Sequence, residues 1–231
     1  MKIAFLGDSI TEGTLGVSFV DIIEKRLPEF SFKNYGVGGD TVGSLYKRIQ
    51  KMNNLNTFDV FVLFIGINDV FGKLNLQHKL IKILSNQSTA KNNVSFKKTY
   101  NDILQYLLTY NKKILIIPPL LLGEDVLSQW NQQVQQLASI VKEQANFYKT
   151  VRFIDLRNIF VERLENKKIS NYLPMKLMSI KKDVDTLKTD PIIDSKSKER
   201  GLHLTLDGVH INSIGANIIA REIIFELQRL K

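Results

Sequence analysis

Five short apolar runs, separated by stretches with helical spacing, constrain the fold of this 231-residue chain more than any other feature. Each run is rich in β-prone residues and is bounded by turn residues, which is typical of buried strands. The runs span residues 2–6, 31–35, 60–65, 114–117 and 151–154. Strands that alternate with helices are joined by right-handed crossovers and form a parallel sheet covered on both faces. The sequence therefore predicts an α/β fold, a three-layer α/β/α sandwich around a five-stranded parallel sheet.

The intervening helices are predicted from apolar residues three and four positions apart. The clearest stripe passes through Leu127, Trp130, Val134, Leu137, Val141 and Ala145. A last helix is predicted to begin near Asn212 and Ser213, because both residue types are good N-caps. We expect these stripes to face the core, and we expect the last helix to pack on the sheet.

Length and composition favour one domain, spanning residues 1–231. The chain has 44% hydrophobic and 24% charged residues, and a chain of this size buries roughly 70 to 75% of its unfolded surface. The segment at about 158–206 fits the strand and helix pattern poorly, since it contains two prolines and many charges. Long connections inside compact domains are often lids or binding loops. We therefore expect a long insertion or lid there.

The positive charge of the chain is concentrated in one segment. Lys and Arg exceed Asp and Glu by 32 to 23, and residues 73–113 alone hold eight Lys against one acid, Asp102. One interpretation is a surface that attracts an anionic glycan or membrane. The other is an ordinary solvated face, which we favour. No Arg-rich or aromatic-interleaved stripe accompanies the lysines, so no nucleic-acid partner is expected.

Other classes are excluded by what the sequence lacks. The chain has no cysteine, so a thiol nucleophile, a Cys-ligated metal and a disulfide framework are all excluded. The first residues are too short an apolar stretch for a signal peptide, and no run is long enough for a transmembrane helix. We expect a soluble, cytoplasmic protein, and the oligomeric state is left open.

Polar clusters follow the first three predicted strands, at residues 7–11, 36–41 and 66–69. The carboxyl ends of parallel strands meet at one edge of a sheet, so these clusters should converge. A fourth cluster, 207–210, precedes the last helix and contains Asp207 and His210. Because they are three positions apart, the carboxylate can reach the near ring nitrogen and leave the far nitrogen pointing outward.

Together the clusters contain the groups that acyl transfer needs. Ser9 is the candidate nucleophile, His210 the general base, and Asp207 the group that orients the imidazole. The tetrahedral oxyanion needs hydrogen-bond donors, and the candidates are the backbone N–H groups of Ser9 and Gly39 and the side-chain amide of Asn68.

Several of these residues have alternative, non-catalytic interpretations. Ser9 and Glu12 match a capping box, so Ser9 could simply begin a helix. Asp8 and Asp69 are expected to support their turns. Four acids could gather at the same edge, but the sequence has no Asp-x-Asp or His-x-His pair, so no metal is expected; they are Asp8, Asp40, Asp69 and Asp207.

The two remaining histidines are weaker candidates for the general base than His210. In addition, the residues around Ser9 do not match one common serine motif. His203 lacks an acid three positions earlier, so we interpret it as a structural or substrate-side residue. His78 lies in the Lys-rich segment and is expected to be exposed. Ser9 is not in a Gly-x-Ser-x-Gly elbow, because Thr11 occupies the last position. That departure argues against the α/β-hydrolase fold.

At this point the chain resembles a known family. Residues 7–11 (GDSIT), the glycine loop ending at 39–41 (GDT), 66–69 (GIND) and 207–210 (DGVH) are similar to the four sequence blocks of the SGNH (GDSL) hydrolases. All four occur in order, and the resemblance covers about 1–156 and 202–231. Two departures are the long segment before Asp207 and Ile211, where many members carry Pro.

The resemblance implies fold, activity and residue roles. The family's Ser, Gly, Asn and His correspond to Ser9, Gly39, Asn68 and His210, and Asp207 completes the triad. A flavodoxin-like sheet with strand order 2-1-3-4-5 is implied, as is esterase, lipase, thioesterase or carbohydrate deacetylase activity without metal or cofactor.

The combined prediction is a serine esterase or acylhydrolase that forms an acyl-Ser9 intermediate. Its substrate would be a small acyl ester, a lipid or an O-acetylated carbohydrate. One alternative is an acyltransferase that uses the same triad. The other is a non-catalytic binder of an anionic glycan or membrane surface through residues 73–113.

Overall fold

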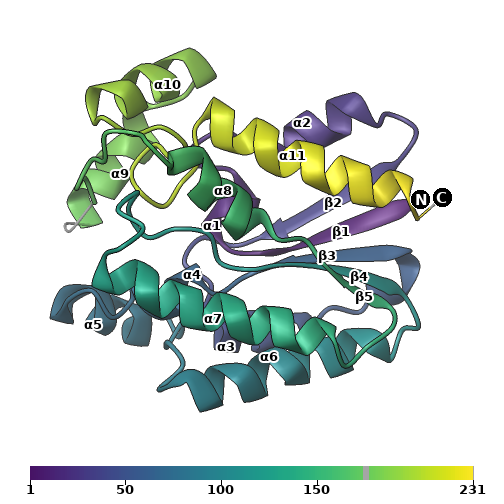
Figure 1. The fold of residues 1–231 in the computed structure, drawn as a ribbon. Coiled ribbons are helices and arrows are strands. Elements are labelled where there is room, and N and C mark those ends of the chain that lie inside the picture. The colour runs from purple at the N-terminus through teal and green to yellow at the C-terminus, as the bar shows by residue number, and fades with distance from the viewer. Residues whose placement is uncertain (174–176, 231) are drawn as a thin grey trace.

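The computed structural model describes residues 1–173 and 177–230. Five parallel strands form one sheet in the order β2-β1-β3-β4-β5 (Figure 1). The strands are β1 (Lys2–Gly7), β2 (Ser31–Gly36), β3 (Val60–Phe64), β4 (Lys113–Ile117) and β5 (Val151–Phe153). Each strand overlaps one of the five predicted runs, so the predicted fold class and strand order are confirmed.

Burial explains why the central strands read as unbroken apolar runs. All five residues of β3 are buried, whereas β2 at the sheet edge is only partly buried. Strands covered by helices on both faces are apolar at every position rather than at alternate positions. The register pairs Gly7 with both Gly36 and Phe64, so the first three strands end at the same edge.

Helices cover both faces of the sheet (Figure 1). One layer contains α2 (Phe19–Arg26), α8 (Leu156–Leu164) and α11 (Ser213–Gln228). The other contains α3 (Val42–Ile49), α6 (Asn93–Leu108) and α7 (Gln129–Ala145). The remaining elements are α1 (Ser9–Glu12), η1 (Leu55–Thr57), α4 (Ile67–Phe71), α5 (Leu76–Leu84), α9 (Leu177–Thr186) and α10 (Asp190–Glu199).

Two helix predictions can be compared with the structure. The last helix begins after Asn212, whose side chain caps it by accepting a hydrogen bond from the Gly215 N–H at 3.0 Å. The predicted stripe on α7 was one residue too long, because Leu127 lies before the helix and is 84% exposed. Ser128 caps α7 by accepting from the Asn131 N–H, so the helix cannot extend back to Leu127 with the same geometry.

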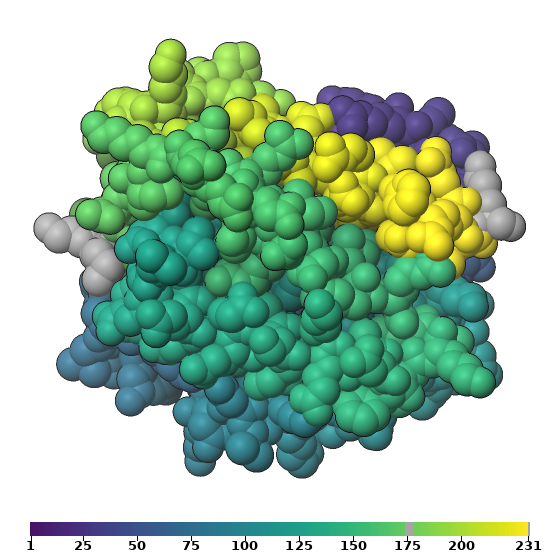
Figure 2. Space-filling view, in the orientation of Figure 1, coloured from purple at the N-terminus to yellow at the C-terminus, as the bar shows by residue number. Residues whose placement is uncertain are grey.

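Much of the segment 158–206 is helical in the part that the structure describes. Its first seven residues, 158–164, belong to α8, which buries Phe160 and Leu164 in the core. The later residues include α9 and α10. Figure 2 shows α8 to α11, coloured green to yellow, over the upper part of one face, above the teal α7. Within residues 1–173 and 177–230, no helix has the length and apolar character needed to cross a membrane.

Candidate active site

Ser9 lies at the first turn of α1, directly after β1. Asp8, rather than Ser9, caps this helix, since Asp8 Oδ1 accepts a hydrogen bond from the Ile10 N–H at 3.0 Å. The alternative in which Ser9 serves as the cap of a capping box is therefore wrong. With the capping position occupied by its neighbour, the Ser9 hydroxyl is left for other contacts.

The structure brings Ser9, His210 and Asp207 into one hydrogen-bonded chain. Ser9 Oγ lies 3.0 Å from His210 Nε2, and His210 Nδ1 lies 2.8 Å from Asp207 Oδ2. The other Asp207 oxygen accepts from the backbone N–H groups of Val209 and His210 at 3.0 and 2.8 Å. This is the arrangement of nucleophile, base and orienting carboxylate that acyl transfer requires.

Burial and charge have opposite effects on the pKa values of Asp207 and His210. Burial alone would raise the pKa of the fully buried Asp207, but His210 and two backbone N–H groups hold it below its ordinary value. Burial alone would lower the pKa of His210, but Asp207 outweighs this and raises it. The geometry thus favours an ionised Asp207 beside an imidazole that readily takes a proton.

The loop that carries Asp207 and His210 is fixed by a residue that sequence reasoning missed. Glu124 is fully buried, and its two oxygens accept hydrogen bonds from the backbone N–H groups of His203, Leu204 and Thr205, each at 2.8 Å. Gly208 closes the loop at φ +87°, a conformation that favours glycine. The sequence does not distinguish this buried acid from an exposed one, because its partners, three backbone N–H groups and the Thr205 hydroxyl, lie 79 to 81 positions away.

The three candidate oxyanion donors lie beside this chain. Ser9, Gly39, Asn68 and His210 line one cavity. Gly39 has φ +80°, and Asn68 is 6% exposed. The Asn68 Nδ2 is buried and has no hydrogen-bond partner within the described part of the chain. An unpaired buried amide donor is costly, so this group has an unused capacity to donate a hydrogen bond.

Asp8 supports its own turn, as expected, whereas Asp69 holds the backbone of two other segments. Asp69 accepts from the backbone N–H groups of Val42 and Ala90 at 2.9 and 2.8 Å. Burial raises the pKa of Asp8 to about 7 and that of Asp69 to about 6. Among the described residues, no group of three or more His, Asp or Glu is arranged to hold a metal ion.

The cavity has a volume of about 290 Å³ and an apolar wall. The apolar lining comes from α4, α5, α9 and the loop after α1, through Phe71, Ile81, Ile180, Val184 and Leu15. The helices that supply it gather at the end of the sheet opposite the start of β1 (Figure 1). The wall is suited to the non-reacting part of an ester.

Two side chains of α5 differ from expectation. His78, predicted to be exposed, is 2% exposed and packs edge-on against the Phe71 ring at 4.6 Å between centroids. Lys82, counted with the solvated lysines, is 8% exposed and lines the cavity. In the sequence, only the spacing of four residues indicates that His78 and Lys82 share one face of a helix. The lysines around them obscure that signal. His203 has the structural contact expected of it, with Nε2 3.0 Å from the Lys168 carbonyl oxygen.

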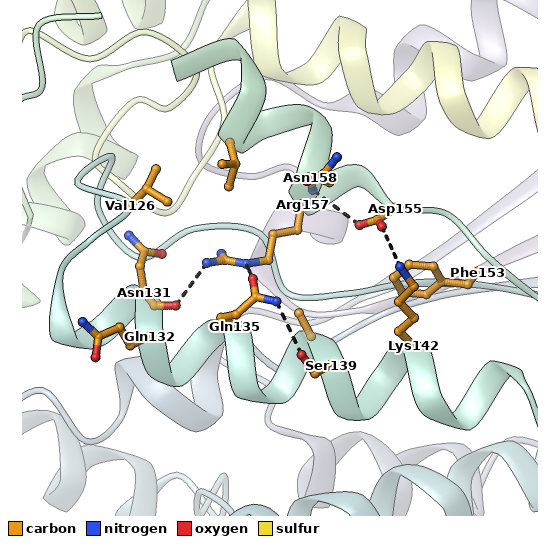
Figure 3. A pocket seen from close by; sticks show the side chains of 12 residues that line it. Val126, Asn131, Gln132, Gln135, Ser139, Lys142, Phe153, Asp155, Arg157 and Asn158 are labelled. Atoms are coloured by element: carbon orange, nitrogen blue, oxygen red, sulfur yellow. Dashed lines mark hydrogen bonds and ion pairs between the residues drawn. The ribbon is translucent and has the colours of Figure 1, made fainter. Parts of the chain in front are cut away.

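A second cavity of about 440 Å³ lies between α7 and α8 (Figure 3). Its central side chain, Arg157, donates to Gln135 Oε1 at 2.7 Å, to the Asn131 carbonyl at 3.0 Å and to the Leu120 carbonyl. These acceptors are all neutral, and they tie α8 to α7. The cavity contains none of the predicted catalytic residues, and we assign it a structural role.

Comparison with known proteins gives the family. The sequence profile of the GDSL-like Lipase/Acylhydrolase family matches residues 5–172. The chain belongs to this family. The matched residues include Ser9, Gly39 and Asn68, while Asp207 and His210 lie beyond them. Membership makes this GDSL-like protein a serine ester hydrolase and removes the non-catalytic binder as an alternative. No curated protein matches the sequence.

Solved structures share the fold at low sequence identity. The acetyl xylan esterase AlAXEase is 22% identical, with a TM-score of 0.69 over 98% of this chain and 100% of that one. Axe2, an acetylxylan esterase from Geobacillus stearothermophilus, is 20% identical, with a TM-score of 0.69 over 98% of this chain and 93% of that one. LAE5, an alpha/beta hydrolase enzyme from the metagenome of Lake Arreo, Spain, is 18% identical, with a TM-score of 0.68 over 100% and 96%.

Proposed function

We propose that this GDSL-like protein hydrolyses a small carboxylic ester through an acyl-Ser9 intermediate. The observation that carries the proposal is the continuous chain from Ser9 Oγ to His210 to Asp207, at 3.0 and 2.8 Å. Each link has the length of a good hydrogen bond, and the far end is a buried carboxylate that accepts two further backbone bonds.

The chemistry follows from that order. Ser9 Oγ attacks the ester carbonyl carbon, and its proton passes to His210 Nε2. When the tetrahedral intermediate collapses, the bond to the alcohol oxygen breaks and the alcohol leaves with that proton. A water molecule then repeats the sequence on the acyl-enzyme, again giving its proton to His210, and the acid leaves as Ser9 regains a proton.

The oxyanion of each tetrahedral intermediate is assigned to three donors: the backbone N–H groups of Ser9 and Gly39, and Asn68 Nδ2. The Nδ2 atom is favoured because it is buried with no partner in the part of the chain that is described. Donors fixed before the reaction stabilise developing charge without reorganising, and each one contributes about 100 to 1000-fold in turnover.

The substrate we favour has a short acyl group. A cavity of about 290 Å³ lies near the lower limit of about 300 Å³ for small-molecule sites. The apolar wall suits an aliphatic group. Two of the structures with this fold are acetyl xylan esterases, so an O-acetylated carbohydrate is our leading substrate class.

We further propose that residues 1–231 form one hydrolase domain and that part of the 158–206 insertion covers the site. Support comes from Ile180 and Val184 of α9, which line the cavity with Ser9. Residues 158–164 are excluded from this cover, because they form part of α8.

The test is hydrolysis of a p-nitrophenyl ester series from acetate to palmitate by wild type and Ser9→Ala. We expect turnover to be highest on acetate and to be lost in Ser9→Ala, together with labelling by a fluorophosphonate. Ser139→Ala, a change at an exposed serine of α7, is the matched control and should retain both. Labelling or turnover that survives in Ser9→Ala with an unchanged melting temperature would exclude Ser9 as the nucleophile.

Two additions to the same assay separate the remaining alternatives. A chelator should leave the rate unchanged if no metal takes part. Added alcohol or sugar should not divert the acyl group, whereas an acyltransferase would form the transferred ester in preference to free acid.

A further inference from the structure

The helix α5 reverses the usual arrangement of polar and apolar residues. Its buried side chains are His78 and Lys82, at 2% and 8% exposure. Its leucines are exposed, Leu76 at 70% and Leu84 at 83%. Burying a lysine is unfavourable unless its ammonium finds good hydrogen-bond partners. The hydrogen-bond partners of Lys82 therefore indicate which part of the structure this helix supports.

Lys82 contacts two of the three candidate oxyanion residues. Its Nζ donates a hydrogen bond to the side-chain oxygen of Asn68 at 3.0 Å and another to the backbone carbonyl of Gly39. Lys82 forms no ion pair with a carboxylate in residues 1–173 or 177–230. This buried cation therefore bonds to two neutral oxygens and is not paired with an acid among the described residues. Both oxygens belong to the segments that contain Gly39 and Asn68, which we call the oxyanion loops.

The contact with Asn68 determines which way the amide points. An ammonium group can only donate, so the atom facing Lys82 must be Oδ1. Nδ2 is then turned away from Lys82, and it is this atom that is buried without a partner among the described residues. If Lys82 were absent, the amide could rotate and present its oxygen to the cavity, which would repel an oxyanion.

Gln87 acts on the other loop. Its Nε2 donates to the Gly38 carbonyl oxygen at 2.9 Å. That carbonyl and the Gly39 N–H belong to the same planar peptide unit and point in opposite directions. Holding the carbonyl therefore fixes the direction of the Gly39 N–H. Gln87 is in turn anchored to α5, since its backbone N–H donates to the Lys82 carbonyl at 2.8 Å.

The glycine loop is packed tightly on both side chains. A Cβ added at Gly39 would lie 2.7 Å from Gln87 Oε1 and 2.9 Å from Lys82 Nζ. Such distances are shorter than carbon contacts allow, so a side chain at this position would displace the ends of Gln87 and Lys82. Gly39 also has φ +80°, which a side chain would oppose.

We propose that Lys82 and Gln87 are positioning residues of the oxyanion hole, with Lys82 aiming the Asn68 amide and Gln87 aiming the Gly39 N–H. The proposal rests on the proposed function, because it assigns these residues to a hole that serves Ser9. The segment after α4 thereby becomes part of the reaction machinery, although it lies outside the four sequence blocks.

Lys82 also gives the proposal a pH signature. Burial lowers the pKa of Lys82 to about 8, and the nearby acids Asp8, Asp69 and Asp40 act in the opposite direction. The other titratable groups that line the same cavity are Glu12, His78 and His210. Turnover should therefore fall above about pH 8, as Lys82 loses its proton and its hold on Asn68.

The decisive experiment compares Lys82→Met, Lys82→Arg and Gln87→Met with Lys79→Met, which changes an exposed lysine on the same helix. With p-nitrophenyl acetate, we expect Lys82→Met to lower kcat by about 10 to 100-fold, since a misaimed donor loses part of its contribution. KM should change little, and the alkaline loss of activity should disappear. Lys82→Arg should recover part of kcat, and Lys79→Met should match wild type.

A double-mutant cycle separates positioning from general structural support. Lys82→Met should have a much smaller effect in an Asn68→Ala background than in wild type, because Lys82 acts through Asn68. Independent effects that multiply would overturn the proposal. So would a Lys82→Met enzyme with wild-type kcat and melting temperature, or one in which only KM changes.

The outcomes distinguish this inference from the proposed function. If wild type shows Ser9-dependent turnover but Lys82→Met and Gln87→Met behave like Lys79→Met, only the positioning proposal fails. If wild type shows no Ser9-dependent turnover or labelling, both fail together. Should Lys82→Met not fold, Gln87→Met gives the same test alone, with lower kcat at constant KM expected and an unchanged kcat contradicting the proposal.

Discussion

The helix α5, which lines the candidate cavity, and the helix α11, which begins three positions after His210, are built in opposite ways. α11 buries Ile219, Ile223 and Leu227 completely. α5 buries His78 and Lys82 and leaves its leucines exposed. The proposed base, His210, thus precedes a helix that is packed in the core. The proposed oxyanion donors Gly39 and Asn68 are contacted by a helix whose buried side chains are polar.

This difference predicts different local stabilities. A helix with few buried apolar contacts opens at a lower free energy than one packed in the core. We therefore expect α5 to be less protected from local opening than α11. Because Lys82 and Gln87 hold the oxyanion loops, such opening would loosen the donors without moving the base.

The largest loss of activity is expected from a change at Asp207, which lies shortly before α11. Asp207→Asn should lower kcat by about 10⁴-fold, as the same change does in serine proteases, because an amide stabilises the wrong imidazole tautomer. The change also removes the group that outweighs burial and raises the pKa of His210. Since His210 acts as a base only when neutral, the acidic limb of the kcat profile should move to lower pH.

A kcat profile over pH 4 to 9 checks both parts of this prediction. Asp155→Asn changes an exposed carboxylate that is paired with Lys142, and it provides the control. An Asp207→Asn enzyme with near wild-type turnover would contradict the roles assigned to this side of the site.

A smaller effect is expected on the α5 side. Asn68→Ala removes one oxyanion donor and should lower kcat by about 100 to 1000-fold. Fluorophosphonate labelling should slow in parallel, because that reaction also develops charge on an oxygen. A loss as large as that of Asp207→Asn would show that Asn68 also holds the base in place, and the division between the two sides would then be wrong.

The residues of the site also differ in whether their positions and contacts could be predicted from the sequence. The strands, their order and the loops that contain Ser9, Gly39 and Asn68 follow from local patterns and ordered motifs. A run such as 60–65 is apolar wherever it is buried on both faces, so its role is visible locally. His210 and Asp207 are three positions apart, and their pairing is also a local property.

The contacts of Lys82 and Glu124 could not be predicted in this way. Lys82 lies 43 positions from Gly39, and Glu124 lies about 80 positions from the backbone that it holds. Most of their partners are backbone carbonyls and N–H groups, which leave no residue-specific trace in a single sequence; the side-chain partners are Asn68 for Lys82 and Thr205 for Glu124. A buried lysine among seven other lysines therefore resembles a solvated one until the fold is known.

The packing of α11 in the core is tested by truncating one of its buried side chains. Ile223 is fully buried, and Ile223→Ala should reduce the free energy of unfolding by about 2 to 5 kcal/mol, through lost burial and the cavity left behind. Urea denaturation gives the change directly. A loss below about 1 kcal/mol would mean that α11 is not anchored by the core as its burial indicates.

Asp8, which faces Lys82 from the start of α1, gives a pH-dependent effect. Burial raises its pKa to about 7 in the folded protein from an ordinary value of 3.8. Between these values the folded state holds a proton that the unfolded state has lost, so this group's contribution to stability falls as the pH rises through the window. The loss is complete above about pH 7.

Asp8→Asn should remove that slope, because an amide does not ionise and its oxygen can still accept from the Ile10 N–H. We expect equal stability near pH 4 and a gain on the order of 2 kcal/mol over wild type at pH 8, since each pKa unit corresponds to about 1.4 kcal/mol and relaxation recovers part of it. Thermal unfolding across pH 4 to 8 measures this difference. A wild-type curve parallel to that of Asp8→Asn would contradict it.

The smallest effect is expected at the outer face of α5. Leu84 is 83% exposed, so Leu84→Ala removes almost no buried surface and should change the free energy of unfolding by less than about 0.5 kcal/mol. This is the direct counterpart of Ile223→Ala, an apolar residue truncated on a helix beside the same site. A loss above about 1 kcal/mol that grows with protein concentration would contradict the comparison. It would show that a second copy of the chain covers this face, and α5 would then be held by apolar packing as α11 is.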